Sequence, residues 1–513
     1  MKVCLINPSR LMKLMSASMR PSPPLGLAYI AGALKADGHD VYIIDAIAEA
    51  PDQYVAFKGR KDIVIHGLLS RQIIQLIHPD TELIGITMMF SINWLHQREL
   101  IDEIGNAFPG VPIIAGGEHA TAVPEFCIRQ TQCLTACVLG EGEETVIDLV
   151  KALAENSPLE NVPGIVFRNE YSQPQRTAPR KRIREVAQIP RPYWDIFPFQ
   201  KYTSHGISFG VELQNSFALP LMATRGCPYE CTFCSSPQMW GTKYSMRPAS
   251  DVADEIELYV GKYGVCNFDF YDLTAVINKR WIIEFAKEIV QRRLDIVWQI
   301  PAGTRSEAID REVAYWLYRS GCRNITYAPE SGSPEILQTI KKKVSLDRML
   351  QSIRHSSEEK MNIKINFMIG FPDEGHRHIW QSIWFLIRAS WAGVNDMAPA
   401  IFTPYPGSAL FQRLVDEGKI NIEDDEYFMK IIQADSLWNI HFYNEKVNPS
   451  LLRIYALVYL FVFYFTNYLF RPVRLIRTMR NLLLRRFESR AEWALAELLK
   501  RTKTKVITAE QVR

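Results

Sequence analysis

One short stretch of the sequence, RGCPYECTFCSSP at residues 225–237, has residue types and spacing that can support metal chemistry. Cys227, Cys231 and Cys234 are separated by three residues and then by two. Thiolates bind zinc and iron, and closed zinc or iron–sulfur sites usually have four protein ligands. Three cysteines therefore leave two interpretations: a fourth ligand elsewhere in the chain, or a metal site with one open position.

The elements around this stretch indicate how the cysteines are positioned. We expect apolar strands, each followed by a helical segment, at about 219–223, 266–271, 296–300, 324–328, 363–368 and 396–402. Six such units predict a partial (β/α)6 barrel over residues 216–435. In such barrels the chemistry lies on the loops after the strands. The cysteine stretch follows the first strand.

Polar residues also follow the next three strands of the predicted barrel. Asp272 follows the second strand, Arg305 the third and Glu330 the fourth. Since these loops share one rim, we expect their side chains to surround the three thiols. This arrangement favours an iron–sulfur cluster with one iron left for a ligand over a structural zinc site completed by Cys266.

The pattern Cys-x3-Cys-x2-Cys, with an aromatic residue before the last cysteine, resembles the radical S-adenosylmethionine (SAM) superfamily. The resemblance implies that Cys227, Cys231 and Cys234 bind three irons of a 4Fe–4S cluster and that SAM chelates the fourth. One-electron reduction then cleaves SAM to methionine and a 5′-deoxyadenosyl radical. It also implies a one-electron reductant as partner, such as a flavodoxin or ferredoxin.

The same resemblance implies further contacts to SAM. Phe233 would lie against the adenine, while Asp272, Arg305 and Glu330 would hold the ribose hydroxyls, carboxylate and amino group. The alternatives are that Asp272 caps the following helix and that Arg305 pairs with Glu330. The loop after the fifth strand reads GFPDEGH instead of the family's G-x-P-G-E-T, so no contact is transferred to it.

The first 155 residues predict a separate α/β domain. The apolar segments KVCLIN, DVYIID, ELIGIT, VPIIAG and ACVLG alternate with amphipathic helical stretches. This alternation is typical of a doubly wound, Rossmann-like parallel sheet, in which ligands bind at the carboxyl ends of the strands. In this chain those ends carry the loops NPSR, TMMFS, AGGEHA and LGEGEET.

Such a domain ahead of the barrel resembles the cobalamin-binding branch of the radical SAM enzymes. The matching segments are PPLGLAYIAGALKADGHDVYIIDA, AGGEHATAVPE, GEGEET, RGCPYECTFC and ESGS. Gly116 and Gly117 would let the backbone approach the nucleotide tail of cobalamin. Glu141, Gly142 and Glu143 would open a helix whose amides bond the tail or the corrin amides.

No protein ligand to cobalt is expected from the first loop. The signature D-x-H-x-x-G is absent there, where the chain reads NPSRLMK. His119 follows the fourth strand, and we interpret it as a contact to the nucleotide tail or a surface residue. The alternative for the domain is a cobalamin-shaped fold that has lost its cofactor.

Two regions complete the expected organisation. Residues 156–215 are proline-rich and predict a linker with a hairpin around GIVFRNE. Residues 436–513 predict a helical, aromatic and basic region, in which 454–470 are uncharged and 471–505 contain eleven Lys and Arg against three acidic residues. This pattern indicates a monotopic anchor on an anionic membrane leaflet, or a helix that packs on the open side of the barrel.

Composition limits the class of protein. With 513 residues, 47% hydrophobic and 22% charged, the chain is typical of a folded protein of several domains. A formal net charge of +3 indicates no nucleic-acid partner. The chain runs into its first strand without a signal peptide, so we expect a cytoplasmic protein, peripheral on the inner face of the membrane if the C-terminal region binds lipid.

The leading hypothesis is methylation of an unactivated carbon in a lipid-like or other hydrophobic small molecule, with SAM and cobalamin as cofactors. The second is an oxidative cyclase or ring-forming enzyme with the same cofactors. A tRNA methylthiotransferase is less favoured, because it would need a C-terminal RNA-binding β-domain. A non-catalytic membrane scaffold would not need the cysteine stretch.

Overall fold

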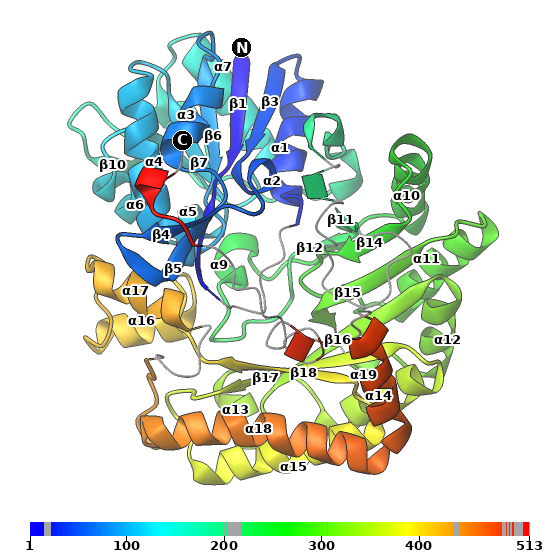
Figure 1. Ribbon diagram of the computed structural model, residues 1–513. Helices are drawn as coiled ribbons and strands as arrows, with labels where there is room; N and C mark the ends of the chain where they lie inside the picture. The colour runs from blue at the N-terminus through cyan, green and yellow to red at the C-terminus, as the bar shows by residue number, and fades with distance from the viewer. Residues whose placement is uncertain are drawn as a thin grey trace.

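The computed structural model describes residues 1–14, 22–198, 201–202, 217–304, 306–434, 441–484, 489, 492, 495–496 and 506–511. In Figure 1 the first α/β domain lies above the partial barrel, and two long helices lie side by side beneath the barrel.

The first domain is built on one sheet in the order β10-β9-β8-β7-β6-β1-β3. The strands are β1 Lys2–Asn7, β3 Asp40–Asp45, β6 Leu83–Thr87, β7 Ile113–Gly116, β8 Leu134–Val138, β9 Ile165–Arg168 and β10 Pro174–Arg176. From β3 to β8 neighbours pair in parallel, and β9 and β10 add antiparallel strands at one edge. The predicted doubly wound sheet is confirmed, and the predicted hairpin extends it.

Helices cover both faces of this sheet. They are α1 Leu25–Ala36, α2 Ala46–Glu49, α3 Ser70–Leu76, α4 Trp94–Ala107, α5 Glu118–Ala122, α6 Pro124–Gln130 and α7 Glu143–Ala154. Val3 and Leu5 of β1 pack with α1 and α7, whereas Cys4 and Ile6 pack with α3, α4 and α6. Both faces of the strand are buried, which is why it is apolar throughout.

A small second sheet in this domain was not predicted. It consists of β2 Arg10–Lys13, β5 Arg60–His66 and β4 Tyr54–Phe57, antiparallel in that order. Close to the end of the chain, Ile507 forms a bridge with Val55 of β4. The C-terminal residues therefore return to the first domain (Figure 1).

The second sheet is the predicted partial barrel, in the order β11-β14-β15-β16-β17-β18 with every pair parallel. Its strands are β11 Leu219–Leu221, β14 Asn267–Phe270, β15 Val297–Thr304, β16 Cys322–Glu330, β17 Asn362–Ile369 and β18 Asp396–Ile401. Its helices are α10 Ala249–Tyr263, α11 Lys279–Gln291, α12 Arg311–Arg319, α13 Pro334–Thr339, α14 Leu346–Glu358 and α15 His376–Ala392. In the described part of the chain no pairing joins β18 to β11, so the barrel is open.

A row of polar side chains crosses four neighbouring barrel strands. Gln299 donates to the Asp269 carboxylate, Asn324 donates to Gln299 over 3.3 Å, and Asn362 donates to Asn324 over 3.1 Å. Asp269, Gln299 and Asn324 are buried, and Asn362 is partly buried. Burial raises the pKa of Asp269 to about 7. The row satisfies polar groups that would otherwise be costly to bury.

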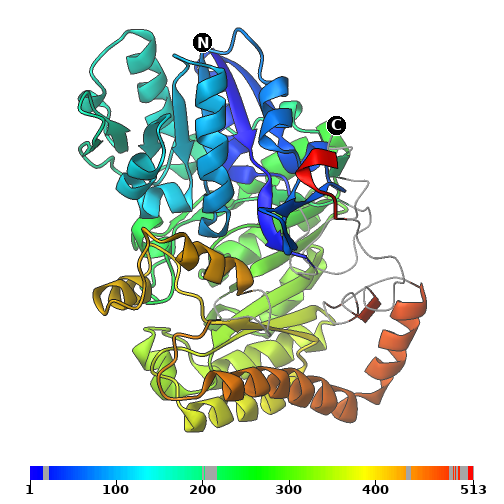
Figure 2. The same ribbon diagram turned by 60° about the vertical axis from the view of Figure 1, so that its left-hand side comes forward.

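Helices at the C-terminal end pack on both domains. Helix α17 Asp425–Gln433, which follows α16 Ala409–Asp416, contacts the first domain, where Arg98 donates two hydrogen bonds to Asp425. Helix α18 Pro449–Phe470 packs along α15 and β18, and α19 Pro472–Leu484 turns away from it (Figure 2). In the described residues α18 is the one helix long and apolar enough to cross a membrane. Helix α18 thus packs on the barrel, which is the second of the two arrangements predicted for residues 454–470.

Candidate active site

The loop that carries the cysteines begins at Gly226, a position where the backbone conformation and the close packing require glycine. The loop follows the short strand β12 Thr224–Arg225, which pairs with β13 Ser245–Met246, and α9 Ser236–Trp240 follows the last cysteine. Gly226 has φ +84°, and a Cβ there would lie 2.1 Å from the carbonyl oxygen of Lys243. A larger residue would therefore displace the start of the loop.

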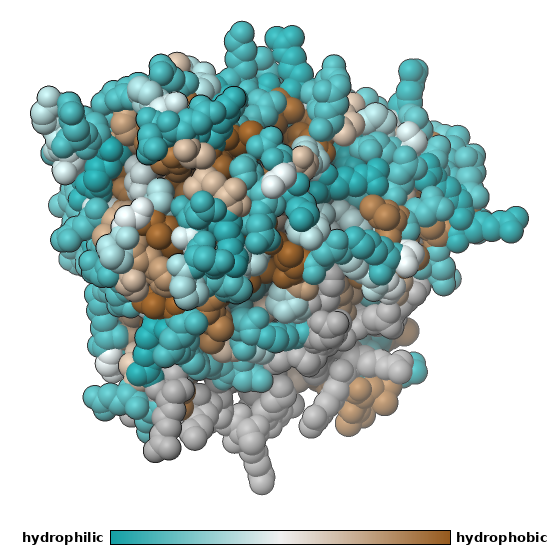
Figure 3. Space-filling model, turned by 90° about the horizontal axis from the view of Figure 1, so that it is seen from above, coloured by the Kyte–Doolittle hydropathy of each residue, from teal (hydrophilic) through white to brown (hydrophobic). Residues whose placement is uncertain are grey.

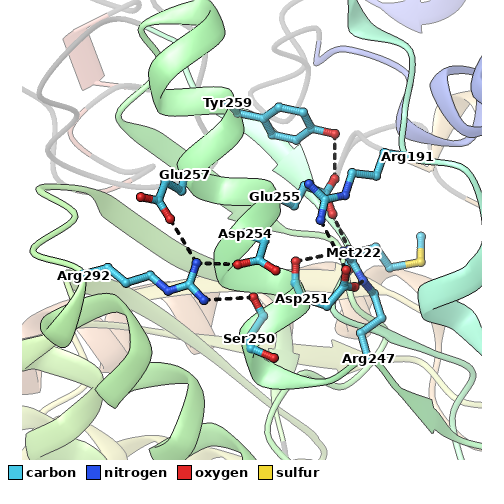
Figure 4. Close-up of polar contacts among 10 residues, drawn as sticks. All are labelled: Arg191, Met222, Arg247, Ser250, Asp251, Asp254, Glu255, Glu257, Tyr259 and Arg292. Carbon is cyan, nitrogen blue, oxygen red and sulfur yellow. Dashed lines mark hydrogen bonds and ion pairs between the residues drawn. The ribbon is translucent and has the colours of Figure 1, made fainter.

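A buried arginine fixes the strand that leads into this loop. Arg247 donates to the carbonyl oxygen of Met222 over 3.0 Å and to Asp251 over 2.7 Å, and it also pairs with Glu255 (Figure 4). Tyr259 donates to the other oxygen of Glu255 over 2.6 Å. The base of the cysteine loop is thereby tied to helix α10.

Asp272 fixes the same segment from the second strand. Its carboxylate accepts hydrogen bonds from the Ala223 amide over 3.3 Å and from the amide and hydroxyl of Thr224. Burial raises the pKa of Asp272 to about 6, and these hydrogen bonds lower it in part. The alternative that Asp272 caps the next helix is wrong, since Asn278 caps α11. A contact between Asp272 and SAM stays a prediction.

The three thiols lie on one turn that is held from two sides. Thr232, inside the turn, donates to the Ile340 carbonyl over 3.0 Å and accepts from the Leu410 amide over 2.8 Å. Cys231 Sγ lies 4.0 Å from the Lys341 carbonyl oxygen, and Cys234 Sγ lies 3.2 Å from Ser236 Oγ. Each cysteine is partly buried.

The electrostatics of the turn suit bound iron better than free thiolates. Burial raises the pKa of Cys231 to about 11, and Lys342 acts in the opposite direction. Throughout the described residues, no three His, Cys, Asp or Glu side chains converge on a single metal-ion position. Cysteines of a cubane cluster bind different irons, so they need not converge on one point, and Lys342 would supply a compensating cation.

Glu330 and Phe233 lie beside this cation. Lys342 Nζ is 3.1 Å from Glu330 Oε1 and 5.8 Å from the centre of the Phe233 ring. Glu330 ends β16 with φ +68°, an uncommon conformation for a residue other than glycine and one found at functional sites. Phe233 also contacts Phe371, with ring centres 5.9 Å apart. Arg305 lies outside the described residues.

The loop after the fifth strand contains a buried acid that the sequence left unassigned. Glu374 accepts a hydrogen bond from the Gly370 amide over 2.6 Å, and its other carboxylate oxygen has no partner. Burial raises the pKa of Glu374 to about 7. Glu374 stands at the position of the glutamate in the family's G-x-P-G-E-T, but Asp373 and Gly375 replace the glycine and threonine on either side of it, which is why no contact was transferred to this loop.

In the first domain, the two glycines of the AGGEHA loop differ. A Cβ at Gly116 would make ordinary contacts with Val138 at 3.8 Å. Gly117 has φ +119°, and a Cβ there would lie 2.8 Å from the carbonyl oxygen of Met88. The chain's own packing therefore requires Gly117, and an approach of the nucleotide tail to either glycine stays a prediction.

His119 is not a surface residue, and that part of the prediction is wrong. Its side chain is buried against the Trp94 ring, with ring centres 5.2 Å apart, and Nδ1 lies 2.9 Å from Ser91 Oγ. Nε2 has no hydrogen-bond partner, and burial lowers the pKa of His119 to about 3. The imidazole is therefore neutral at physiological pH.

The side chains of Glu141 and Glu143 bind the barrel domain. Arg225, two residues before Cys227, donates to Glu141 over 3.2 Å and also pairs with Glu143. Burial acts to lower the pKa of Arg225, but the two carboxylates outweigh it and leave the pKa raised. This buried cluster, which sequence reasoning missed, joins the start of α7 to the cysteine loop. Gly142 is the N-cap of α7, so the helix opens where expected.

A second contact brings the same two loops together. Ser235, next to Cys234, donates a hydrogen bond to Glu118 of helix α5. Gln238 of α9 donates to the Ala122 carbonyl over 3.1 Å. The two loops with cobalamin-like motifs, AGGEHA and GEGEET, thus both contact the cysteine loop or the helix that follows it.

Comparison with protein families matches two parts of the chain. Residues 15–150 match the B12 binding domain, and residues 221–386 match the Radical SAM superfamily. These ranges contain the AGGEHA and GEGEET loops of the first domain and the cysteine loop of the barrel.

Three relatives are similar to this chain over most of its length. An uncharacterized methyltransferase of Pyrococcus horikoshii is 30% identical over 90% of this chain and 93% of its own. Cytidylyl-2-hydroxyethylphosphonate methyltransferase of Streptomyces wedmorensis is 26% identical over 85% and 87%. Anaerobic magnesium-protoporphyrin IX monomethyl ester cyclase of Cereibacter sphaeroides is 28% identical over 78% and 61%.

A solved structure has the same fold. The radical SAM methyltransferase TsrM of Kitasatospora setae, with cobalamin and a 4Fe–4S cluster bound, aligns with a TM-score of 0.62 at 17% identity. The alignment covers 81% of this chain and 78% of TsrM. At this identity the likeness shows the fold.

Proposed function

Because this chain belongs to the cobalamin-binding branch of the radical SAM enzymes, we propose that it methylates an unactivated carbon of a small molecule. When bound, the cluster and SAM supply a 5′-deoxyadenosyl radical, and methylcobalamin supplies a methyl group. The observation that supports this proposal best is the contact of Arg225 with Glu141 and Glu143, because it joins the cysteine loop to the GEGEET loop of the first domain.

The residues of the chain have distinct parts in this proposal. Cys227, Cys231 and Cys234 would hold the cluster, and Lys342 would balance its negative charge. Glu330, held by Lys342, would present its free carboxylate oxygen to the amino group of SAM. Phe233, Asp272 and Arg305 would complete the SAM site, with Asp272 acting mainly on the position of the loop.

The finer features of the proposal concern substrate, reductant and location. We propose a hydrophobic, lipid-like substrate, since α18 exposes apolar side chains such as Phe461 and Phe465. An enzyme of this kind needs single electrons, which a cytoplasmic flavodoxin or ferredoxin would supply.

Anaerobic reconstitution tests the reaction. Enzyme loaded with iron, sulfide and cobalamin is incubated with a reductant, a lipid extract and SAM labelled with deuterium in its methyl group, and products are identified by mass spectrometry. We expect 5′-deoxyadenosine together with a lipid that has gained a labelled methyl group. Failure to form 5′-deoxyadenosine would overturn the proposal.

Ring formation or oxidation is the second candidate function, and the similarity to the cyclase of Cereibacter sphaeroides favours it. The same experiment separates the two. A cyclase would give 5′-deoxyadenosine and a product that has lost hydrogen, without the labelled methyl group.

A further inference from the structure

Helix α15 exposes a stripe of tryptophans on the outside of the barrel. Trp380, Trp384 and Trp391 have exposed fractions of 58, 62 and 62%. Their spacing of four and seven residues places them on one side of the helix, opposite the buried Ile379, Ile383, Leu386 and Ala389. Tryptophan side chains are large and rarely so exposed in a row, and such exposure marks an interaction surface.

Helix α18, which lies beside α15 (Figure 1), exposes a second apolar stripe. Its exposed residues are Ile454 at 53%, Leu457 at 42%, Phe461 at 68% and Phe465 at 55%. The opposite side of the helix packs on the barrel through the buried Leu452, Ala456, Tyr459 and Phe463. One side of α18 is thus occupied by protein, and its apolar stripe lies on the other, exposed side.

The two stripes form one surface. Trp380 contacts Tyr455 with ring centres 6.2 Å apart, and Trp391 contacts Phe470 with ring centres 4.8 Å apart. These contacts join the helices at both ends of the seam. We call this the base surface, defined by Trp380, Trp384, Trp391, Ile454, Leu457, Phe461 and Phe465. Figure 3 shows the upper end of the molecule, where hydrophilic side chains predominate around several hydrophobic patches.

The helices that form the base surface carry positively charged side chains and no negatively charged ones. These helices, α15 and α18, contain Arg377, Arg388 and Arg453 and no aspartate or glutamate. Residues 471–484, which follow α18 and include α19, add four more arginines and no acidic residue. Acidic neighbours come from other elements: Asp347 pairs with Arg388, and Glu335 lies 3.5 Å from Arg377. A second copy of the chain would face these arginines with the same charges, whereas an anionic bilayer complements them.

A cavity of about 670 Å³ opens beside the tryptophan stripe and is lined in part by Trp384. Its lining combines apolar side chains, among them Leu337, Leu346 and Phe385, with Lys341, Lys342, Lys343 and Arg388 and with one acid, Asp347, which pairs with Arg388. This combination suits an amphipathic anion, such as the headgroup and upper chain of a phospholipid. The cavity is a second feature that points to anionic lipid at this face.

We propose that the base surface binds the face of an anionic bilayer, with α15 and α18 lying along the interface and their aromatic rings in the headgroup region. This inference deepens the proposed function and rests on it for its biological meaning. A lipid-like substrate lies in the membrane, and an enzyme bound to the membrane surface would reach it there.

Vesicle flotation of the full chain tests the inference. The vesicles contain equal parts of phosphatidylcholine and phosphatidylglycerol, and vesicles of phosphatidylcholine alone serve for comparison. We expect the chain to float with the anionic vesicles and much less with the neutral ones or at high salt. Trp380→Glu and Phe461→Glu should each weaken binding about tenfold, since each replaces an aromatic anchor with a charge that the leaflet repels.

Tyr171→Glu is the matched control, because Tyr171 is 76% exposed on the first domain, away from the base surface. It should bind like the unaltered chain. Absence of flotation, or flotation that neither variant weakens, would overturn the inference. So would a dimer in solution that Phe461→Glu dissociates, because a second copy would then cover the face.

Production of 5′-deoxyadenosine without vesicles separates this inference from the proposed function. Phe461→Glu should retain it, because Phe461 lies on the outer side of α18. A chain that floats but forms no 5′-deoxyadenosine would refute the proposed function alone, and one that forms it without floating would refute the inference alone.

Discussion

At the scale of single residues, burial raises the pKa of two acids of the site, Asp272 and Glu374, and so stabilises their neutral forms. Asp272 is the clearest case, with a pKa of about 6 against an ordinary value of 3.8. The folded chain therefore retains this proton over a pH range in which the unfolded chain releases it. The free energy of unfolding should fall as pH rises from about 4 to 6, by at most about 3 kcal/mol from this group.

Asp272→Asn should remove this contribution. We expect the difference in free energy of unfolding between pH 4 and pH 7 to shrink by about 1 to 3 kcal/mol relative to the unaltered chain. Urea denaturation at both pH values measures it. An unchanged difference would show that the Asp272 carboxyl is ionised in the folded chain over this whole range.

His119 leads to a second prediction at this scale. Its ring is buried against Trp94, with Nδ1 beside Ser91, so it does not reach the outside of the sheet edge as a metal ligand would. Cobalamin bound to this chain should therefore carry no histidine below the metal. Electron paramagnetic resonance of the cob(II)alamin form should lack nitrogen superhyperfine splitting, and the presence of that splitting would contradict the assignment.

At the scale of elements, the strands could be predicted because their apolar runs are local features of the sequence. The six barrel strands lie within a few residues of the predicted ranges, and the cysteine loop follows the first as expected. Strand β2 was missed because it pairs with β5 across more than fifty residues, as Arg10 with His66 does, and no local pattern records such a pairing. Strands β4 and β5 form a local hairpin, in which Phe57 pairs with Arg60, and the sequence reading overlooked it.

The site was predicted only in part, for the same reason. The spacing of the cysteines is a local pattern, whereas Arg225 meets Glu143 across 82 positions. Arg225 ends the apolar segment LPLMATR, and this was the available signal for a buried ion pair, because a buried cation needs an acidic partner. The sequence could not say which acid supplies it.

A substitution at Gly226 tests whether the stability of the chain and the binding of iron by the cysteine loop depend on this glycine. Gly226→Ala should cost more than about 2 kcal/mol of stability, because it adds strain at positive φ to a collision with Lys243. It should also reduce the iron bound per chain after reconstitution. Gly264→Ala is the control, with φ +65° and open space around a Cβ, and it should cost about 1 kcal/mol without loss of iron.

At the scale of the whole molecule, a buried ion cluster joins the two domains. Arg225→Met would leave Glu141 and Glu143 buried without their cation and should cost about 3 to 5 kcal/mol of stability. Adding Glu141→Gln and Glu143→Gln should recover part of this loss, because the buried charges are then removed together. Chemical denaturation measures both. Equal stability of the single and triple variants would show that the contact does not couple the domains.

The central claim is that three cysteines alone hold a cluster at which SAM is cleaved. The most direct measurement compares iron content and 5′-deoxyadenosine formation after anaerobic reconstitution of three proteins. They are the unaltered chain, a variant with Cys227, Cys231 and Cys234 all replaced by Ala, and Cys266→Ala. We predict that the triple variant loses both iron and product, while Cys266→Ala keeps both. Reductive cleavage of SAM by the triple variant, or loss of iron in Cys266→Ala alone, would contradict the account.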